Sequence, residues 1–128
     1  MPVNDLANGL TYGPLNPEQL LAGDMPIKTD RGTAGANLSK YQIVAVTAAG
    51  VVVFVAGTHT AAQAALTMQA AASGASVQYA YQGVFNDALL AAQAGNATLY
   101  AAAAFDTFAE RRAFFNGLFR VGNLLAAS

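Results

Sequence analysis

The sequence predicts a mainly β fold with short helices, of the α+β class, and two patterns point to it. The most apolar stretch, residues 41–57, is rich in valine and is divided by a glycine-containing turn; β-branched residues favour strands. Residues 77–81 alternate apolar and polar side chains, as a half-buried strand does. With 128 residues and no cysteine, the chain is long enough to bury one core without disulfide bonds.

Four strands are expected in the middle of the chain. Ile43–Val46 and Val51–Ala56 are uninterrupted apolar runs on either side of the turn, which predicts a buried hairpin. Leu66–Ala72 and Val77–Tyr81 flank the turn-forming residues Ser73-Gly74-Ala75-Ser76, which predicts a second hairpin. Gly83 then interrupts the alternating pattern, and Val84-Phe85 closes it.

Short helices are expected next. Asn86 can cap a helix over Asp87–Gln93 that ends at Gly95. The alanine-rich segment Thr98–Phe105 fits a helix and a strand equally well, and both interpretations stay open. A capping box at the start of another helix is predicted by Thr107 and Glu110.

The helix that begins after Thr107 is expected to run to Asn116, with Gly117 as its left-handed stop. Phe108 and Phe115 are seven positions apart and would share its buried face. Leu118–Val121 reads as a last short strand.

The N-terminal part is predicted to contain little regular structure. Residues 1–16 are punctuated by Asn, Gly and Pro, which is typical of an extended arm. Five apolar or aromatic side chains are spaced through this arm as candidate docking anchors: Val3, Leu6, Leu10, Tyr12 and Leu15. An unattached terminus is the alternative. We expect a domain over residues 17–128, which starts with one helical turn at Pro17–Gly23 and a polar loop over 24–40.

The composition is unusually poor in charge. Charged residues make up 10% of the chain and hydrophobic residues 55%, whereas a typical soluble domain is about 25% charged. Between Lys40 and Asp87 no residue carries a formal charge, and the net charge is −1. Either lipid or other protein molecules must therefore cover much of the surface.

A membrane is the weaker of those two explanations. The apolar window 41–57 is shorter than the about 20 residues that a spanning helix needs, and its valines favour strands. The first residues lack a basic segment followed by an apolar one, so no secretory signal is expected. With a net charge of −1, direct nucleic-acid binding is not expected either, because phosphate contacts need several clustered cations.

The residues do not predict catalysis. The one histidine, His59, lies in a predicted turn between two threonines and is interpreted as a loop residue. Without cysteine or a histidine cluster, no metal site is expected, and no cofactor motif is present. Arg111-Arg112 is interpreted as a solvated helix face or an intersubunit pair. We therefore expect a protein that is not an enzyme and has no metal or cofactor.

One order of features carries a resemblance to a known family. It comprises the strand-turn-strand of 43–56, then Ala64-Ala65-Leu66-Thr67-Met68, then Val77–Phe85, then a leucine-rich segment, then Glu110–Phe115 and Gly117-Leu118-Phe119. Over about residues 20–125 this resembles the lambda-type head decoration proteins of tailed bacteriophages. The chain departs from the family pattern in lacking tryptophan and in its alanine-rich stretch between Leu90 and Phe105.

The resemblance implies a compact β domain with an extended N-terminal arm, and a role as a capsid-stabilising cement protein. Its partners would be the major capsid protein and two further copies of itself, forming a homotrimer at local three-fold sites of the expanded shell. The arm would pair with a strand of the capsid protein and help the head resist internal DNA pressure. The expected location is the outer surface of the virion, and the host cytoplasm during assembly. The alternative function is a small membrane-associated or coat-like structural protein built on Tyr41–Gly57.

Overall fold

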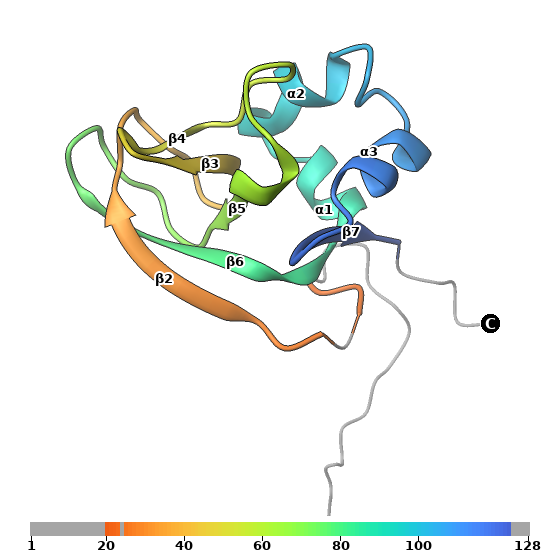
Figure 1. Ribbon diagram of the computed structural model, residues 1–128, viewed down its shortest axis with the longest axis horizontal. Helices are drawn as coiled ribbons and strands as arrows, with labels where there is room; N and C mark the ends of the chain where they lie inside the picture. The colour runs from red at the N-terminus through yellow and green to blue at the C-terminus, as the bar shows by residue number, and fades with distance from the viewer. Residues whose placement is uncertain (1–19, 24, 124–128) are drawn as a thin grey trace, which may run out of the picture.

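A curled, mostly antiparallel sheet with a layer of short helices on one side makes up the protein (Figure 1). The computed structural model describes residues 20–23 and 25–123. Its strands are β2 (Lys28–Thr33), β3 (Ile43–Thr47), β4 (Gly50–Val53), β5 (Ala64–Thr67), β6 (Ser76–Asn86) and β7 (Phe119–Gly122). Its helices are α1 (Asp87–Ala91), α2 (Ala97–Ala101) and α3 (Phe108–Phe114), with 3-10 turns η1 (Ala61–Gln63) and η2 (Ala94–Asn96). The α+β, mainly β class predicted from the sequence is confirmed.

The strand order is β2-β6-β5-β3-β4, and β7 lies parallel to the second half of β6. The sheet curls until its two ends meet. Just after β2, Ala34 pairs with Val51 of β4, and the Gly35 N–H donates to the Val51 carbonyl at 2.8 Å. Gly50 permits this approach, because it has a φ of +115° and a Cβ there would lie 2.5 Å from the Thr33 carbonyl oxygen.

The first predicted hairpin is confirmed as β3 and β4. The Thr47 hydroxyl closes the turn by donating to the Gly50 carbonyl at 3.0 Å and accepting from the Ala49 N–H at 3.1 Å. Strand β4 ends at Val53 rather than at Ala56. Phe54 turns into the core, and the Val55 carbonyl accepts from the N–H groups of the following turn.

The second predicted hairpin has different boundaries. Strand β5 covers Ala64–Thr67 rather than Leu66–Ala72. Beyond Met68 the chain leaves β6, and Ala71 instead exchanges two backbone hydrogen bonds with Leu38 at 2.8 and 2.9 Å. The alternating pattern predicted extended backbone correctly but could not show that its partner changes.

Strand β6 pairs with β2, β5 and β7, and it continues through Gly83, where the alternating pattern is interrupted. The strand runs unbroken over 11 residues. Gly83 has a φ of +149°, and a Cβ there would lie 2.9 Å from the Phe85 ring. Glycine therefore allows the strand to bend while the phenylalanine two residues later folds over it.

The prediction of a polar loop over 24–40 is wrong for Lys28–Thr33, which forms β2. This strand lies antiparallel to β6, and its side chains are mostly exposed. Charged edge strands are common, because charge discourages pairing with other chains. The helical turn predicted at Pro17–Gly23 is also not found in its described part, since Leu21 pairs with Phe85 of β6.

The helix starts were predicted more accurately than the helix ends. The Asn86 side chain caps α1 by accepting from the Ala88 N–H at 3.2 Å, but α1 ends at Ala91 rather than Gln93. Helix α2 settles the ambiguous segment 98–105 in favour of a helix over most of its first half.

Helix α3 begins at its predicted cap, where the Thr107 hydroxyl accepts from the Glu110 N–H at 3.2 Å. It ends at Phe114 rather than Asn116, and Gly117 is not left-handed. Phe115 leaves the helix with φ −92° and ψ +74°, so its ring reaches the core from beyond the last helical turn. Phe108 packs against the same core and is only partly buried. The predicted strand at 118–121 is confirmed as β7, shifted by one residue.

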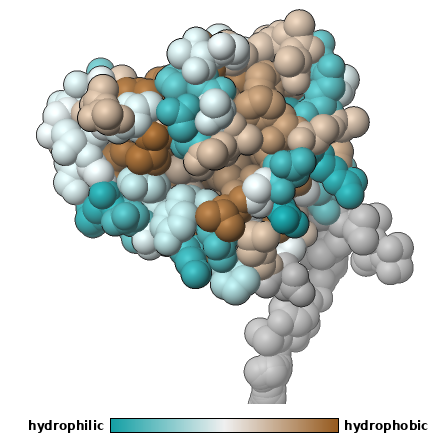
Figure 2. Space-filling view, viewed as in Figure 1, coloured by the Kyte–Doolittle hydropathy of each residue, from teal (hydrophilic) through white to brown (hydrophobic). Residues whose placement is uncertain are grey.

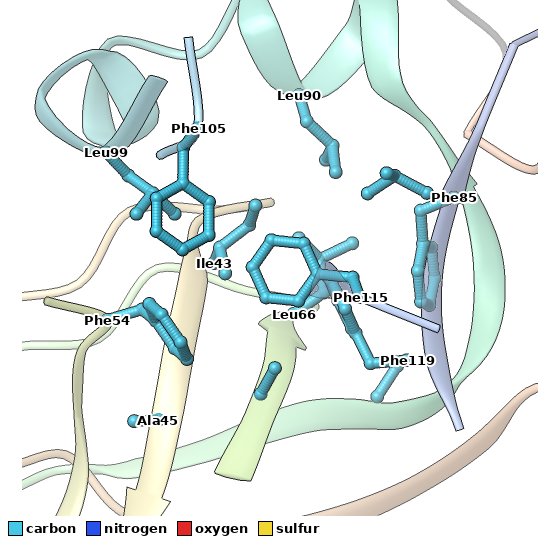
Figure 3. Close-up of a cluster of buried hydrophobic side chains, with 13 residues drawn as sticks. Ile43, Ala45, Phe54, Leu66, Phe85, Leu90, Leu99, Phe105, Phe115 and Phe119 are labelled. Atoms are coloured by element: carbon cyan, nitrogen blue, oxygen red, sulfur yellow. The ribbon is translucent and has the colours of Figure 1, made fainter. Parts of the chain in front are cut away.

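Both faces of the sheet are buried, against different layers. Between sheet and helices lies an aromatic core, whose buried phenylalanines are Phe54, Phe85, Phe105, Phe115 and Phe119 (Figure 3). Inside the curl lies an aliphatic core, made of Ala34, Leu38, Val44, Val51, Ala65, Val77 and Tyr79. Successive residues of β3 alternate between the two, with Ile43 and Ala45 in the first and Val44 in the second. This accounts for the unbroken apolar sequence of β3.

Candidate functional site

The five residues predicted to anchor the arm lie outside the described residues: Val3, Leu6, Leu10, Tyr12 and Leu15. The structure does describe Leu20–Ala22, which follow the predicted arm closely in the sequence. Ala22 donates its N–H to the Val84 carbonyl at 3.0 Å, and the Leu20 carbonyl accepts from the Asn86 N–H at 2.6 Å. We call Leu20–Ala22 the arm root. It pairs with β6 through an isolated antiparallel bridge between Leu21 and Phe85, so backbone hydrogen bonds fix its own position on the sheet.

A hollow of about 690 Å³ lies beside the arm root. It is lined by Ala22, Val84, Phe108, Arg112, Phe115, Asn116, Arg120, Val121, Gly122 and Asn123. We call it the basic hollow, because its two charged lining residues are both arginines and both are exposed. Hydrophilic surface lies over α3 and β7 on this side of the molecule (Figure 2). This site could not be predicted from the sequence, because its residues come from four separate segments.

A second hollow, of about 340 Å³, adjoins the first through Asn116. Its lining contains no charged residue and consists of Ala61, Ala62, Ala64, Tyr81, Asn116, Gly117, Leu118 and Phe119. Leu118 is 57% exposed, which is unusual for a large apolar side chain at the rim of a hollow. We call this the apolar hollow; it is a candidate contact surface for another protein.

Arg111 does not belong to a solvated helix face or an intersubunit pair, as the sequence suggested. It is buried and holds Asp87 in a two-pronged ion pair, with Nε to Oδ1 at 2.8 Å and Nη2 to Oδ2 at 2.7 Å. Its Nη1 donates to the Phe105 carbonyl at 2.7 Å. Helical spacing explains the error, because adjacent residues of a helix point about 100° apart, so Arg112 is exposed while Arg111 is not.

Tyr100 completes this buried cluster. Its hydroxyl donates to Asp87 Oδ1 at 2.9 Å, and the Arg111 guanidinium lies 4.1 Å from the centre of its ring. Burial raises the pKa of Tyr100 far above its ordinary value, and the Asp87 charge adds to the rise. The hydrogen bonds to Asp87 raise the pKa of Arg111. Since the three side chains come from α1, α2 and α3, the cluster ties the helical layer together.

A second polar cluster ties that layer to the sheet. The buried Asn96 accepts from the Ile43 N–H at 2.8 Å and donates to the carbonyls of Leu90 at 2.9 Å and Tyr41 at 3.1 Å. Gln42 reaches the same loop by donating to the Gly95 carbonyl at 3.3 Å. These hydrogen bonds hold the alanine-rich segment against the sheet. The side chains of Asn96 and Gln42 therefore have a structural role.

His59 is a loop residue, as predicted. Its Nδ1 accepts from the Val55 N–H at 2.9 Å, and its ring centre lies 5.5 Å from that of Phe54. Within residues 20–23 and 25–123 no group of three or more His, Asp or Glu side chains could hold a metal ion. In the same residues no helix is long and apolar enough to cross a bilayer.

No protein-family model matches the chain, and no curated protein matches it either. The features that bear on function are therefore the arm root, the basic hollow, the apolar hollow and the distribution of charge.

Proposed function

We propose that this protein is a phage capsid decoration protein, which binds the expanded lattice of the major capsid protein as a trimer and stabilises the head. Residues 1–16 act as an arm that pairs with a strand of the capsid protein. The protein has a structural rather than an enzymatic role, and it resides on the outer surface of the virion after assembly in the host cytoplasm.

The observation that carries this proposal is the arm root. Leu20–Ala22 is fixed to β6 by two backbone hydrogen bonds, so whatever precedes it starts from a defined place and direction on a rigid body. Nineteen residues could span up to about 60 Å at about 3.3 Å per residue. An arm of this length can reach a neighbouring molecule, and extended segments bind by adding a strand to a sheet edge.

The distribution of charge also supports the proposal. Strands β3, β4, β5 and β6 all come from the charge-free stretch between Lys40 and Asp87. Val55, an apolar residue in this stretch, is 48% exposed. A surface of this kind suits protein contact, as in a trimer seated on a shell.

A trimer explains how a short arm could bind tightly. Three arms on one body raise the effective concentration of the second and third contacts, so the assembly binds far more strongly than one arm does. If the arms bind the expanded shell and not the unexpanded one, they stabilise the expanded state by mass action.

The test is to delete residues 1–16 and measure cosedimentation with expanded and unexpanded shells. We expect the full-length protein to sediment with expanded shells, and the shortened one to fold and trimerise but stay in the supernatant. A matched variant keeps the arm length but replaces Val3, Leu6, Leu10, Tyr12 and Leu15 by serine, and it should also fail to bind. Equal binding by the shortened protein would refute the arm's role. Sedimentation with lipid vesicles instead of shells would favour the membrane-associated alternative.

A further inference from the structure

We propose that the basic hollow binds a carboxylate-bearing segment of the partner protein, in which an acidic side chain is flanked by apolar ones. This inference rests on the proposed function, because it takes the partner to be the capsid protein that receives the arm. It names the chemistry of a second contact, made by the folded domain rather than by the arm.

The lining of the hollow combines two kinds of surface. Arg112 of α3 and Arg120 of β7 supply two guanidinium groups. The same lining includes an apolar part, made of Phe108, Phe115 and Val84. A guanidinium pairs with a carboxylate through two parallel hydrogen bonds, and the apolar part favours apolar neighbours of that carboxylate.

The two arginines have no carboxylate partner within the described residues. The ion pair that this part of the chain does contain uses Arg111, one position before Arg112, and buries it against Asp87. Arg120 is held in place at one end, since its Nε donates to the Gly117 carbonyl at 2.8 Å. Fixing a side chain before binding lowers the entropy lost when a ligand arrives.

The position of the hollow indicates the same partner as the arm. Ala22 belongs both to the arm root and to the lining of the hollow. A protein that pairs with the arm close to its root would therefore lie next to Arg112 and Arg120. Nucleic acid fits less well, because two arginines on a chain of net charge −1 give little of the clustered charge that phosphate binding needs.

The experiment uses the full-length protein with Arg112→Gln and Arg120→Gln together. Arg31→Gln is the matched control, because Arg31 is an exposed arginine on β2 that donates to the Ser76 hydroxyl and does not line the hollow. We expect the double variant to bind expanded shells about tenfold more weakly or worse, since hydrogen bonds between charged groups are the stronger class. The control should bind like the unchanged protein. Both should melt at the unchanged temperature.

The single variant Arg112→Gln is not expected to disturb folding, because the Arg112 side chain makes no hydrogen bond or ion pair within residues 20–23 and 25–123. It therefore separates an effect on binding from an effect on folding. It should weaken shell binding without moving the melting temperature. Shell binding equal to that of the unchanged protein in both the single and the double variant would overturn the inference, while leaving the proposed function intact.

A shell-independent measurement uses short peptides in which glutamate alternates with leucine, and the same peptides with glutamine in place of glutamate. Titration followed by NMR should show the glutamate peptide shifting the signals of Arg112, Arg120 and Val121, with binding that weakens as salt is added. The glutamine peptide should bind about tenfold more weakly. Equal binding of the two peptides, or displacement of the glutamate peptide by a DNA duplex, would overturn the inference whatever happens with shells.

Discussion

The two cores of the protein lie on opposite faces of the same strands and are held together differently. In the aromatic core, the Phe115 ring centre lies 5.1 Å from that of Phe119, 5.5 Å from that of Phe54 and 5.8 Å from that of Phe105 (Figure 3). The aliphatic core contains valines, alanines, one leucine and Tyr79. Large rings fill the space between sheet and helices, and small side chains fill the narrower curl.

This difference determines which core depends on the end of the chain. Phe105, Phe115 and Phe119 belong to the last quarter of the sequence, so the aromatic core is incomplete until the helical layer has docked. The aliphatic core is closed by segments between Ala34 and Tyr79. We therefore expect the aromatic core to be the more sensitive of the two, because one ring there contacts several elements at once.

The largest expected effect comes from Phe115→Ala. Phe115 is 1% exposed and touches three other buried phenylalanines. Its removal should lower the free energy of unfolding by about 3–5 kcal/mol, from lost burial and the cavity left behind. Urea unfolding followed by circular dichroism measures this. An unchanged midpoint would show that the aromatic core does not depend on this ring.

Val77→Ala probes the aliphatic core and should have a smaller effect. Val77 is fully buried in β6, and the change removes two carbon groups worth about 0.8 kcal/mol each, plus a small cavity. We expect a loss of about 2 kcal/mol in the same unfolding experiment. A loss of stability as large as that of Phe115→Ala would contradict the expectation that the aromatic core is the more sensitive of the two.

The sequence predicted elements with local signals and missed those that depend on distant partners. The hairpin of β3 and β4 was found because valines surround a turn, and α3 was found from the Thr107 and Glu110 pair. Strand β2 was missed, because an exposed charged edge strand has the composition of a loop. The end of β5 was misplaced, because Leu38 takes over the pairing at Ala71.

The candidate site was still harder to predict. The arm root, the basic hollow and the buried Asp87–Arg111 pair all join segments that are far apart in the chain. Arg111 and Arg112 look alike in a list of charges, and their opposite burial follows from the direction in which α3 presents each side chain to the domain. Only a three-dimensional arrangement separates the structural arginine from the exposed one.

The smallest expected effect at neutral pH comes from Tyr100→Phe, which tests how the helical layer of the aromatic core is tied together. Loss of the hydroxyl hydrogen bond to Asp87 should cost about 1 kcal/mol, because Asp87 keeps both bonds from Arg111. The dependence of the free energy of unfolding on pH distinguishes the contribution of this hydrogen bond from that of the packing of the ring. The pKa of Tyr100 is raised in the folded protein, whereas in the unfolded chain it is about 10.

A raised folded pKa means that the stability contributed by the protonated hydroxyl is fully present below pH about 10 and is lost as the pH rises above it. The free energy of unfolding should therefore fall more steeply above pH about 10 in the unchanged protein than in Tyr100→Phe, and the gap between them should close. Tyr79, whose pKa is also raised by burial, is present in both proteins, so its contribution cancels. A gap that stays constant over this range would show that the hydroxyl of Tyr100 is not held as a donor to Asp87, and that α2 is joined to the Asp87–Arg111 pair by packing alone.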